Sequence, residues 1–170
     1  MSLIRQNFHE ESEAAINKQI NMELYASYVY LGLAYQFDRH DVALKGFHDF
    51  FLENSNEERE HAQKFMKYLN NRGGTIKMAP IQPPSKIDYQ TGLEAMQAAL
   101  QLERDVNESL LNLHELASKH CDPHLTDFIE EEFLDEQVKS MKKIGDHITN
   151  LKRVGTGLGE YQFDKLTLRE

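Results

Sequence analysis

The feature that most constrains this chain of 170 residues is a Glu-x-x-His pair in the middle of a long helical pattern. The pattern runs from Val42 to Arg72, and the pair consists of Glu58 and His61. Residues three apart lie on the same face of an α-helix, so both side chains can bind one ion. A single pair of this kind is usually a solvated part of a polar helix face. Whether Glu58 and His61 belong to a metal site therefore depends on whether the other helices also carry metal-binding residues at their centres.

Apolar residues at intervals of three and four predict further long helices. The first covers about residues 10–37, with a buried stripe of Ile16, Ile20, Leu24, Ser27, Leu31 and Ala34. The third covers about residues 92–119. A fourth helix begins with Pro123 behind an Asp122 N-cap and ends near Val154. A short fifth helix is expected from Glu160 to about Thr167.

The connections set the direction of each helix. Residues 38–41 form a short loop, so the first two helices are expected to be antiparallel neighbours. Residues 75–89 lack periodicity and contain three prolines. At about 3.3 Å per residue they span roughly 50 Å, against about 42 Å for the first helix. The sequence therefore predicts an all-α four-helix bundle with one long crossover between helices two and three, a short C-terminal helix, and a single domain over residues 1–170.

A near-repeat relates the two halves of the bundle. Glu23 and Glu58 are 35 residues apart, and Glu103 and Gln137 are 34 apart. Each half is a helix with one central acid, a connection, and a helix with a pair of polar residues three apart. In the second half that pair is Gln137 and Ser140, an amide and a hydroxyl. Such residues at the middle of all four helices favour a metal site.

Composition excludes several classes of function. The formal net charge of −9 argues against nucleic-acid binding and suits a protein that attracts cations. The single cysteine, Cys121, rules out an internal disulfide framework and fits a reducing compartment. Residues 1–13 lack the apolar core of a secretory signal, and no long uncharged run suggests a membrane span. We expect a cytoplasmic protein.

Several blocks of sequence resemble a eukaryotic ferritin of the catalytic heavy-chain type, in order and over nearly the whole chain. Glu-x-x-His is the metal-binding unit of helical carboxylate bundles, of which ferritin-like proteins are the standard example. The blocks that carry the resemblance are Glu23–Tyr28, Asp38-Arg39, Asp41–Leu44, Glu57–Ala62, Arg72–Gly74, Asp122–Leu125, Glu160-Tyr161 and Phe163–Lys165.

This resemblance implies a 24-subunit hollow shell, of one subunit type or mixed with related subunits. The shell takes up Fe(II), oxidises it with dioxygen and stores ferric mineral. Two iron ions are held transiently in each subunit, and other divalent cations can substitute in vitro. Position by position, the first iron is assigned to Glu23, Glu58 and His61, and the second to Glu58, Glu103 and nearby Gln137, with Tyr30 beside them.

The resemblance also assigns roles outside the diiron site. Asp127 and Glu130 match the acids of the family's three-fold ion channels, with His114 at the outer approach and Thr126 where many relatives have cysteine. For Glu130, an acidic first turn that favours the helix dipole is the alternative.

Glu53, Glu57 and Glu60 are either a solvated face or a cavity wall that nucleates mineral. Leu158, Gln162 and Leu166 match the line that faces the four-fold axis; Gln162 and Leu166 differ from the leucine and histidine common there.

Three alternatives remain open at the level of sequence. A storage-only subunit lacks the central Glu/His set, which this chain has. An unrelated four-helix interaction module such as a cytokine needs two long crossovers, and only one is present. Another di-iron oxidase fits poorly with Gln137 and Ser140 in the second half.

Overall fold

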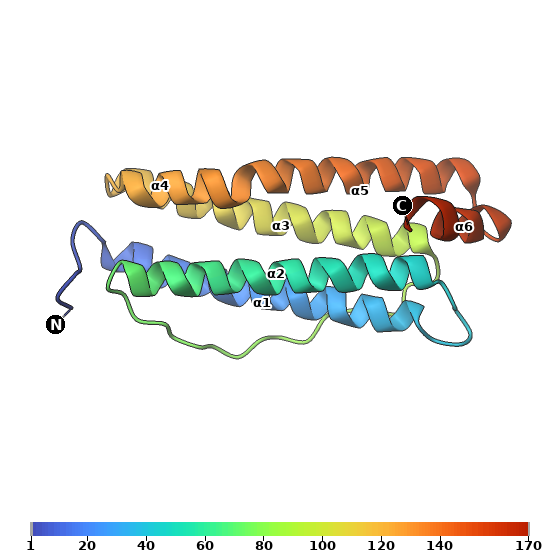
Figure 1. Cartoon of the computed structure of the whole chain (residues 1–170), viewed down its shortest axis with the longest axis horizontal. Helices are drawn as coiled ribbons and strands as arrows, with labels where there is room; N and C mark the ends of the chain where they lie inside the picture. The colour runs from blue at the N-terminus through green and yellow to red at the C-terminus, as the bar shows by residue number, and fades with distance from the viewer. Residues whose placement is uncertain (1, 170) are drawn as a thin grey trace.

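The computed structural model describes residues 2–169, which are helical apart from loops and turns. Four long rods lie side by side, with a short helix across one end (Figure 1). The fourth rod is continuous from α4 through the π-helical segment η1 to α5. The elements are α1 (Glu10–Phe37), α2 (Lys45–Asn71), α3 (Gly92–Lys119), α4 (Pro123–Ile129), η1 (Glu130–Leu134), α5 (Asp135–Val154), α6 (Leu158–Gln162) and the π-helical segment η2 (Phe163–Thr167).

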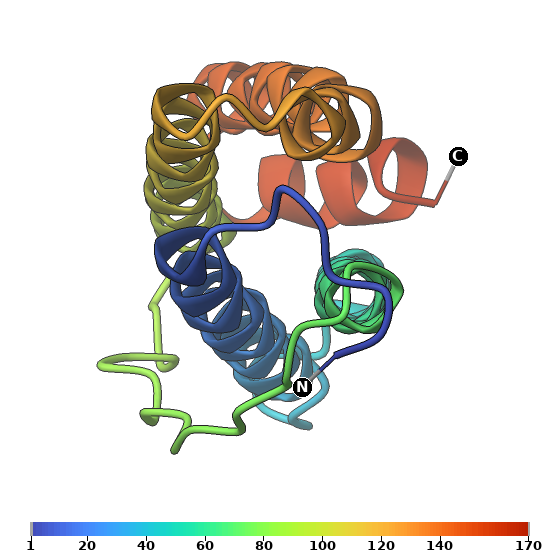
Figure 2. The same ribbon diagram turned by 90° about the vertical axis from the view of Figure 1, so that its left-hand side faces the viewer.

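The crossover between α2 and α3 runs the length of the bundle, as the sequence predicted. It lies along the outside of α1 and returns the chain to the end where α2 begins, so that α3 is parallel to α2 (Figures 1 and 2). Side chains of α1 hold it there. The amide of Asn17 accepts a hydrogen bond from Lys77 N at 2.7 Å and donates one to Thr75 O at 3.0 Å. Asn21 donates to the carbonyl of Pro80 at 3.1 Å. The predicted ferritin-like bundle is confirmed.

The predicted start of the second helix is wrong by three residues. Residues 42 and 43 belong to a turn, and Ala43 has a φ of 53° that no α-helical residue adopts. Helix α2 begins at Lys45 without a side-chain cap from the preceding residue, Leu44. The carboxylate of Asp164, far away in sequence, accepts the N–H of Phe47 at 2.9 Å instead. A cap supplied from the other end of the chain leaves no local sequence signal.

Of the predicted buried stripe of α1, Ile16, Ile20 and Ala34 are buried as expected, but Leu24 and Ser27 are half-buried and Leu31 is exposed. Leu31 is 40% exposed, whereas Glu23, Ala26 and Tyr30 are buried on the line that faces the bundle. The prediction placed the buried face of α1 too far to one side because it counted only apolar residues. Two of the inward positions hold polar side chains, the carboxylate of Glu23 and the phenol of Tyr30. The residues that pack inward at the end of α1 are Leu33, Ala34 and Phe37.

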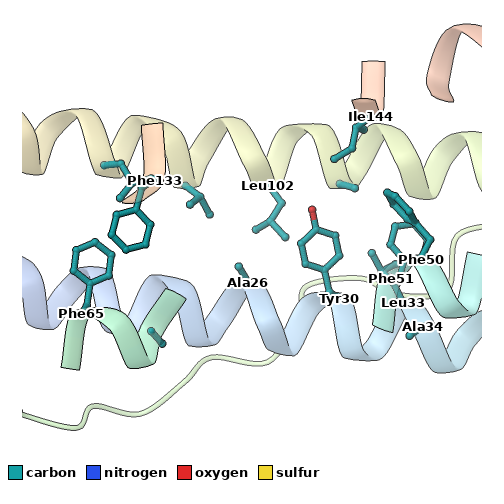
Figure 3. Close-up of a cluster of buried hydrophobic side chains, with 14 of the residues drawn as sticks. Ala26, Tyr30, Leu33, Ala34, Phe50, Phe51, Phe65, Leu102, Phe133 and Ile144 are labelled. Atoms are coloured by element: carbon teal, nitrogen blue, oxygen red, sulfur yellow. The ribbon is translucent and has the colours of Figure 1, made fainter. Parts of the chain in front are cut away.

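The π-helical segment η1 was not predicted within the fourth rod. Wide π turns insert one extra residue into a helix and shift the faces on either side. In η1, the buried Phe133 stacks on Phe65 of α2 with ring centroids 4.3 Å apart and an interplanar angle of 4°. Figure 3 shows these two rings at one end of the drawn cluster of buried side chains, with Tyr30 further along it. The C-terminal helix likewise begins at Leu158, before the predicted Glu160, and ends in η2.

Within residues 2–169 there is no helix that is both long and apolar enough to cross a membrane.

Candidate metal centre

Three of the predicted ligands meet in the interior between α1 and α2. Glu23, Glu58 and His61 each place one ligand atom within 4.8 Å of the other two, and all three are buried. His61 Nδ1 lies 3.3 Å from Glu58 Oε2 and 4.0 Å from Glu23 Oε2. The helical spacing of three puts Glu58 and His61 on one face, and the antiparallel packing of α1 brings Glu23 opposite them.

Burial makes the two carboxyl groups unfavourable as anions. Desolvation, followed by the nearby charge of Glu58, raises the pKa of Glu23 well above its usual value. Desolvation likewise raises the pKa of Glu58 to about 8. Glu23 Oε2 is a buried oxygen without a hydrogen-bond partner. Buried carboxylates are normally paired with a cation or a donor, so this arrangement fits a site for a positively charged ion.

A hydrogen-bonded chain that the sequence did not reveal orients Glu23. The amide of Gln19 donates to Glu23 Oε1 at 2.9 Å, and the hydroxyl of Ser109 on α3 donates to Gln19 Oε1 at 2.5 Å. The buried Gln19 lies one turn before Glu23 on the same face of α1. That spacing of four was the available signal. Because Gln19 donates only to Oε1, the Oε2 atom of Glu23 is left free to bind an ion.

Glu103 lies in a second buried cluster and not in the three-residue group. The hydroxyl of Tyr30 donates to Glu103 Oε1 at 2.5 Å, and the amide of Gln137 donates to Glu103 Oε2 at 3.1 Å. Desolvation raises the pKa of Glu103, and it raises the pKa of Tyr30 well above its usual value. Tyr30 is therefore a neutral donor. Ser140, one turn after Gln137, is half-buried.

Glu136 is a further acid at the centre that the sequence reading missed. Its Oε2 lies 3.3 Å from His61 Nε2, while 45% of its side chain is exposed. Desolvation, with smaller contributions from Glu53 and Glu136, raises the pKa of Glu57 on α2. Glu136 is therefore near both the buried His61 and the exposed Glu57 of α2. The predicted nucleation residues Glu53, Glu57 and Glu60 are all exposed.

The predicted channel acids are near one end of the bundle, in the first part of the fourth rod (Figure 1). Asp127 and Glu130 are both exposed, and Glu130 Oε1 lies 3.2 Å from His114 Nε2. The first turn of α4 contains no acidic residue. The alternative explanation of Glu130 by an acidic first turn is therefore wrong, because the dipole effect fades beyond that turn. Thr126 Oγ1 donates to the carbonyl of Pro123 at 3.1 Å.

The C-terminal elements present an apolar line to solvent. Leu158 and Leu166 are 71% and 65% exposed, and Gln162 between them is also exposed. Cys121 is an exposed free thiol in the turn before α4.

Comparisons with known proteins agree with this architecture. A profile of the ferritin-like domain matches residues 13–154. The chain is similar to soma ferritin of Lymnaea stagnalis, with 64% identity over 168 residues, which cover 99% of this chain and 97% of the relative.

Proposed function

The chain belongs to the ferritin family, whose members bind and store iron in oligomeric shells, and we propose that this member is a catalytic subunit of the heavy-chain type. It oxidises Fe(II) to Fe(III) with dioxygen at the buried centre and deposits the product as ferric mineral inside the shell. The observation that carries this proposal is the buried Glu23, Glu58 and His61 group, which contains a carboxylate oxygen without a partner.

The donor set suits iron as a passing substrate. Carboxylate oxygens favour hard cations and the ferric product, and one imidazole is compatible with Fe(II). The first iron is assigned to Glu23, Glu58 and His61. The second shares Glu58 and adds Glu103, with Gln137 beside it. Two Fe(II) ions would together supply two electrons to one dioxygen molecule, which with two protons is reduced to hydrogen peroxide while the ions become Fe(III).

The protein's own groups supply the remaining steps. An incoming cation displaces the protons that burial favours on Glu23 and Glu58, because only the carboxylates bind metal. Tyr30 and Gln137 hold Glu103 in place by hydrogen bonds to both of its oxygens. At the second position Gln137 contributes no charge, which weakens metal binding and suits release of the product.

Other parts of the chain fit the storage function. We assign Asp127 and Glu130 to the channel through which iron enters, and Glu53, Glu57 and Glu60 to the inner wall where mineral nucleates. The exposed apolar residues Leu158 and Leu166 are assigned to subunit contacts in a 24-subunit cytoplasmic shell. A storage-only subunit is the second candidate, and the complete central Glu/His set argues against it.

The decisive experiment removes the two central ligands of α2. The double variant Glu58→Lys, His61→Gly should lose fast Fe(II) oxidation in air by at least about a hundredfold, because the loss of two ligands removes both metal positions. Ferric absorbance after rapid mixing measures the rate, and light scattering confirms that the shell is assembled.

A matched control introduces the same two residues on the exposed face of α2, as Asn56→Lys, Gln63→Gly. This control should oxidise Fe(II) at the wild-type rate. Wild-type kinetics in the Glu58→Lys, His61→Gly variant would reject the catalytic proposal and favour the storage-only subunit.

A further inference from the structure

A second group of metal-type side chains lies away from the buried centre, where α1 begins and α3 ends. It consists of His9, Glu11 and His120, whose ligand atoms lie within 4.8 Å of one another. The two imidazole rings are stacked, with centroids 3.6 Å apart and an interplanar angle of 8°. His120 Nε2 lies 2.8 Å from Glu11 Oε2. His9 and Glu11 are exposed and His120 is half-buried, so ions in solution can reach all three.

The fold holds these side chains on two fixed helix ends. His9 is the N-cap residue of α1, and His120 is the C-cap residue of α3. The segment before His9 is attached to the rest of the bundle on both sides. Arg72 donates to the carbonyl of Asn7 at 2.9 Å, and the Asn7 amide donates to the carbonyl of Cys121 at 3.1 Å. The backbone that carries His9 and His120 is therefore held in place before an ion binds.

The donor set differs in chemistry from that of the buried centre. Two imidazoles and one carboxylate, with open positions towards solvent, are the ligands of many zinc sites. The buried centre has one imidazole among several oxygen donors, which suits iron better.

His120 and Glu11 are already close to the separation that a shared ion requires. Two ligands of a tetrahedral zinc ion, with bonds of about 2.1 Å, lie about 3.4 Å apart. The observed distance of 2.8 Å is that of a hydrogen bond, so the two groups move apart by about 0.6 Å when an ion enters. An ion there takes the place of the proton that His120 shares with Glu11.

His9 must rotate before it can become the third ligand. A metal ion lies in the plane of an imidazole that binds it, and two stacked parallel rings cannot both point at one ion. In addition, His9 Nδ1 accepts the backbone N–H of Glu11 at 3.1 Å. Rotation out of the stack gives up this cap and turns a ring nitrogen towards the carboxylate.

We propose that His9, Glu11 and His120 form a surface site for zinc, separate from the iron centre. The bound ion joins the start of α1 to the end of α3. It thereby fixes the N-terminal segment against the turn that leads into α4. Zinc binding at this site does not require oxidation of iron. The zinc proposal can therefore be tested, and rejected, without any consequence for the catalytic assignment.

Crystals of the full-length wild-type protein soaked in Zn(II) test the site directly. Anomalous diffraction at the zinc edge should show a peak about 2.1 Å from a ring nitrogen of both His9 and His120. The peak should be present at the zinc concentration that fills the buried centre. Absence of density between the two histidines at that concentration would overturn the proposal.

Zinc titrations in solution provide the second readout. They use the Glu58→Lys, His61→Gly background, in which the buried centre cannot bind. Adding His120→Asn should weaken the site at least tenfold, whereas adding His40→Asn, an exposed histidine in the α1–α2 loop, should leave it unchanged. Equal zinc binding in the two triple variants would contradict the assignment of His120, whatever the crystals show elsewhere on the surface.

Discussion

At the residue scale, the carboxyl group of Glu58 can hold either a proton or a metal ion, so the protonation of the metal-free protein and its binding of a cation are coupled at this side chain. Desolvation raises the pKa of this carboxyl from 4.5 to about 8. At neutral pH the metal-free centre therefore holds a proton on the group that is assigned to bridge two irons. Metal uptake and proton release at this position are one exchange.

This exchange predicts how pH affects the metal-free protein. Between about pH 5 and 8 the folded chain binds more protons at Glu58 than the unfolded chain, because the folded pKa is the higher of the two. The free energy of unfolding therefore falls as the pH rises through this window. Glu58→Gln should stabilise the metal-free protein at pH 8, by roughly 1–3 kcal/mol, and have little effect near pH 4.5.

Thermal unfolding of metal-free protein at both pH values measures this effect, with Glu115→Gln on the exposed face of α3 as the control. Equal stabilisation by Glu58→Gln at the two pH values would show that the buried carboxyl does not titrate as described.

The two metal positions should also differ in affinity. Glu23, Glu58 and His61 supply two carboxylates and an imidazole, whereas Gln137 and Ser140 supply no charge to the other position. At limiting Zn(II) or Fe(II), the first position should fill at least about tenfold more tightly. Crystallographic occupancies over a series of metal concentrations measure the ratio. Equal occupancies at low metal would refute the asymmetry.

At the scale of secondary-structure elements, α6 and η2 hold the starts of two other helices. Asp164 Oδ1 accepts Phe47 N of α2 at 2.9 Å, and Glu160 Oε2 accepts Gly92 N of α3 at 2.9 Å. Asp164 is fully buried, and α2 has no side-chain cap of its own. The C-terminal segment is therefore fixed to the bundle by hydrogen bonds at its two acids.

Removing the first of these caps should loosen the C-terminal segment. Asp164→Ala is expected to cost about 1–2 kcal/mol of stability, because the N–H of Phe47 loses its partner. The segment should then be cut faster by protease. Asp146→Ala, which removes an exposed carboxylate paired with Lys142, is the control and should be nearly neutral. Equal cleavage of the two variants would argue against a holding role for Asp164.

The elements show which features a single sequence can reveal. The limits of α1 and α3 followed from the periodicity of apolar residues, and the parallel course of α3 followed from the length of the crossover. The start of α2 did not, because its cap is Asp164, more than a hundred residues later. The π turn of η1 was also missed: it places Phe133 against Phe65 of α2, and no spacing rule contains that contact.

The same distinction holds for the candidate site. Glu58 and His61 could be paired from their spacing, and the near-repeat suggested Glu23 and Glu103. Gln19 and Glu136 were missed because their roles depend on partners on other helices, Ser109 for the former and His61 for the latter.

At the scale of the whole molecule, the net charge of −9 acts together with the proposed channel. A ring of carboxylates in a narrow opening concentrates cations and speeds their entry. Asp127→Ala, Glu130→Ala should slow oxidation at limiting Fe(II) several-fold without altering the buried ligands. The remaining rate should depend less on ionic strength, because the local field is weaker. Stopped-flow absorbance over a salt series measures both effects.

The control for this prediction is Glu131→Ala, Asp135→Ala, which removes two exposed acids from the same rod and changes the net charge equally. If both double variants take up iron at the same rate, entry does not depend on Asp127 and Glu130.

The antiparallel packing of α1 and α2 has a consequence for the order in which this protein matures. All three groups assigned to the first metal position come from these two helices, which a short loop joins. Contacts between segments close in sequence form early, and a chain emerging from the ribosome folds its N-terminal part first. The second position needs Glu103 and Gln137, which the ribosome adds later. A nascent chain therefore carries every donor of the tighter position before the second half of the bundle has been synthesised.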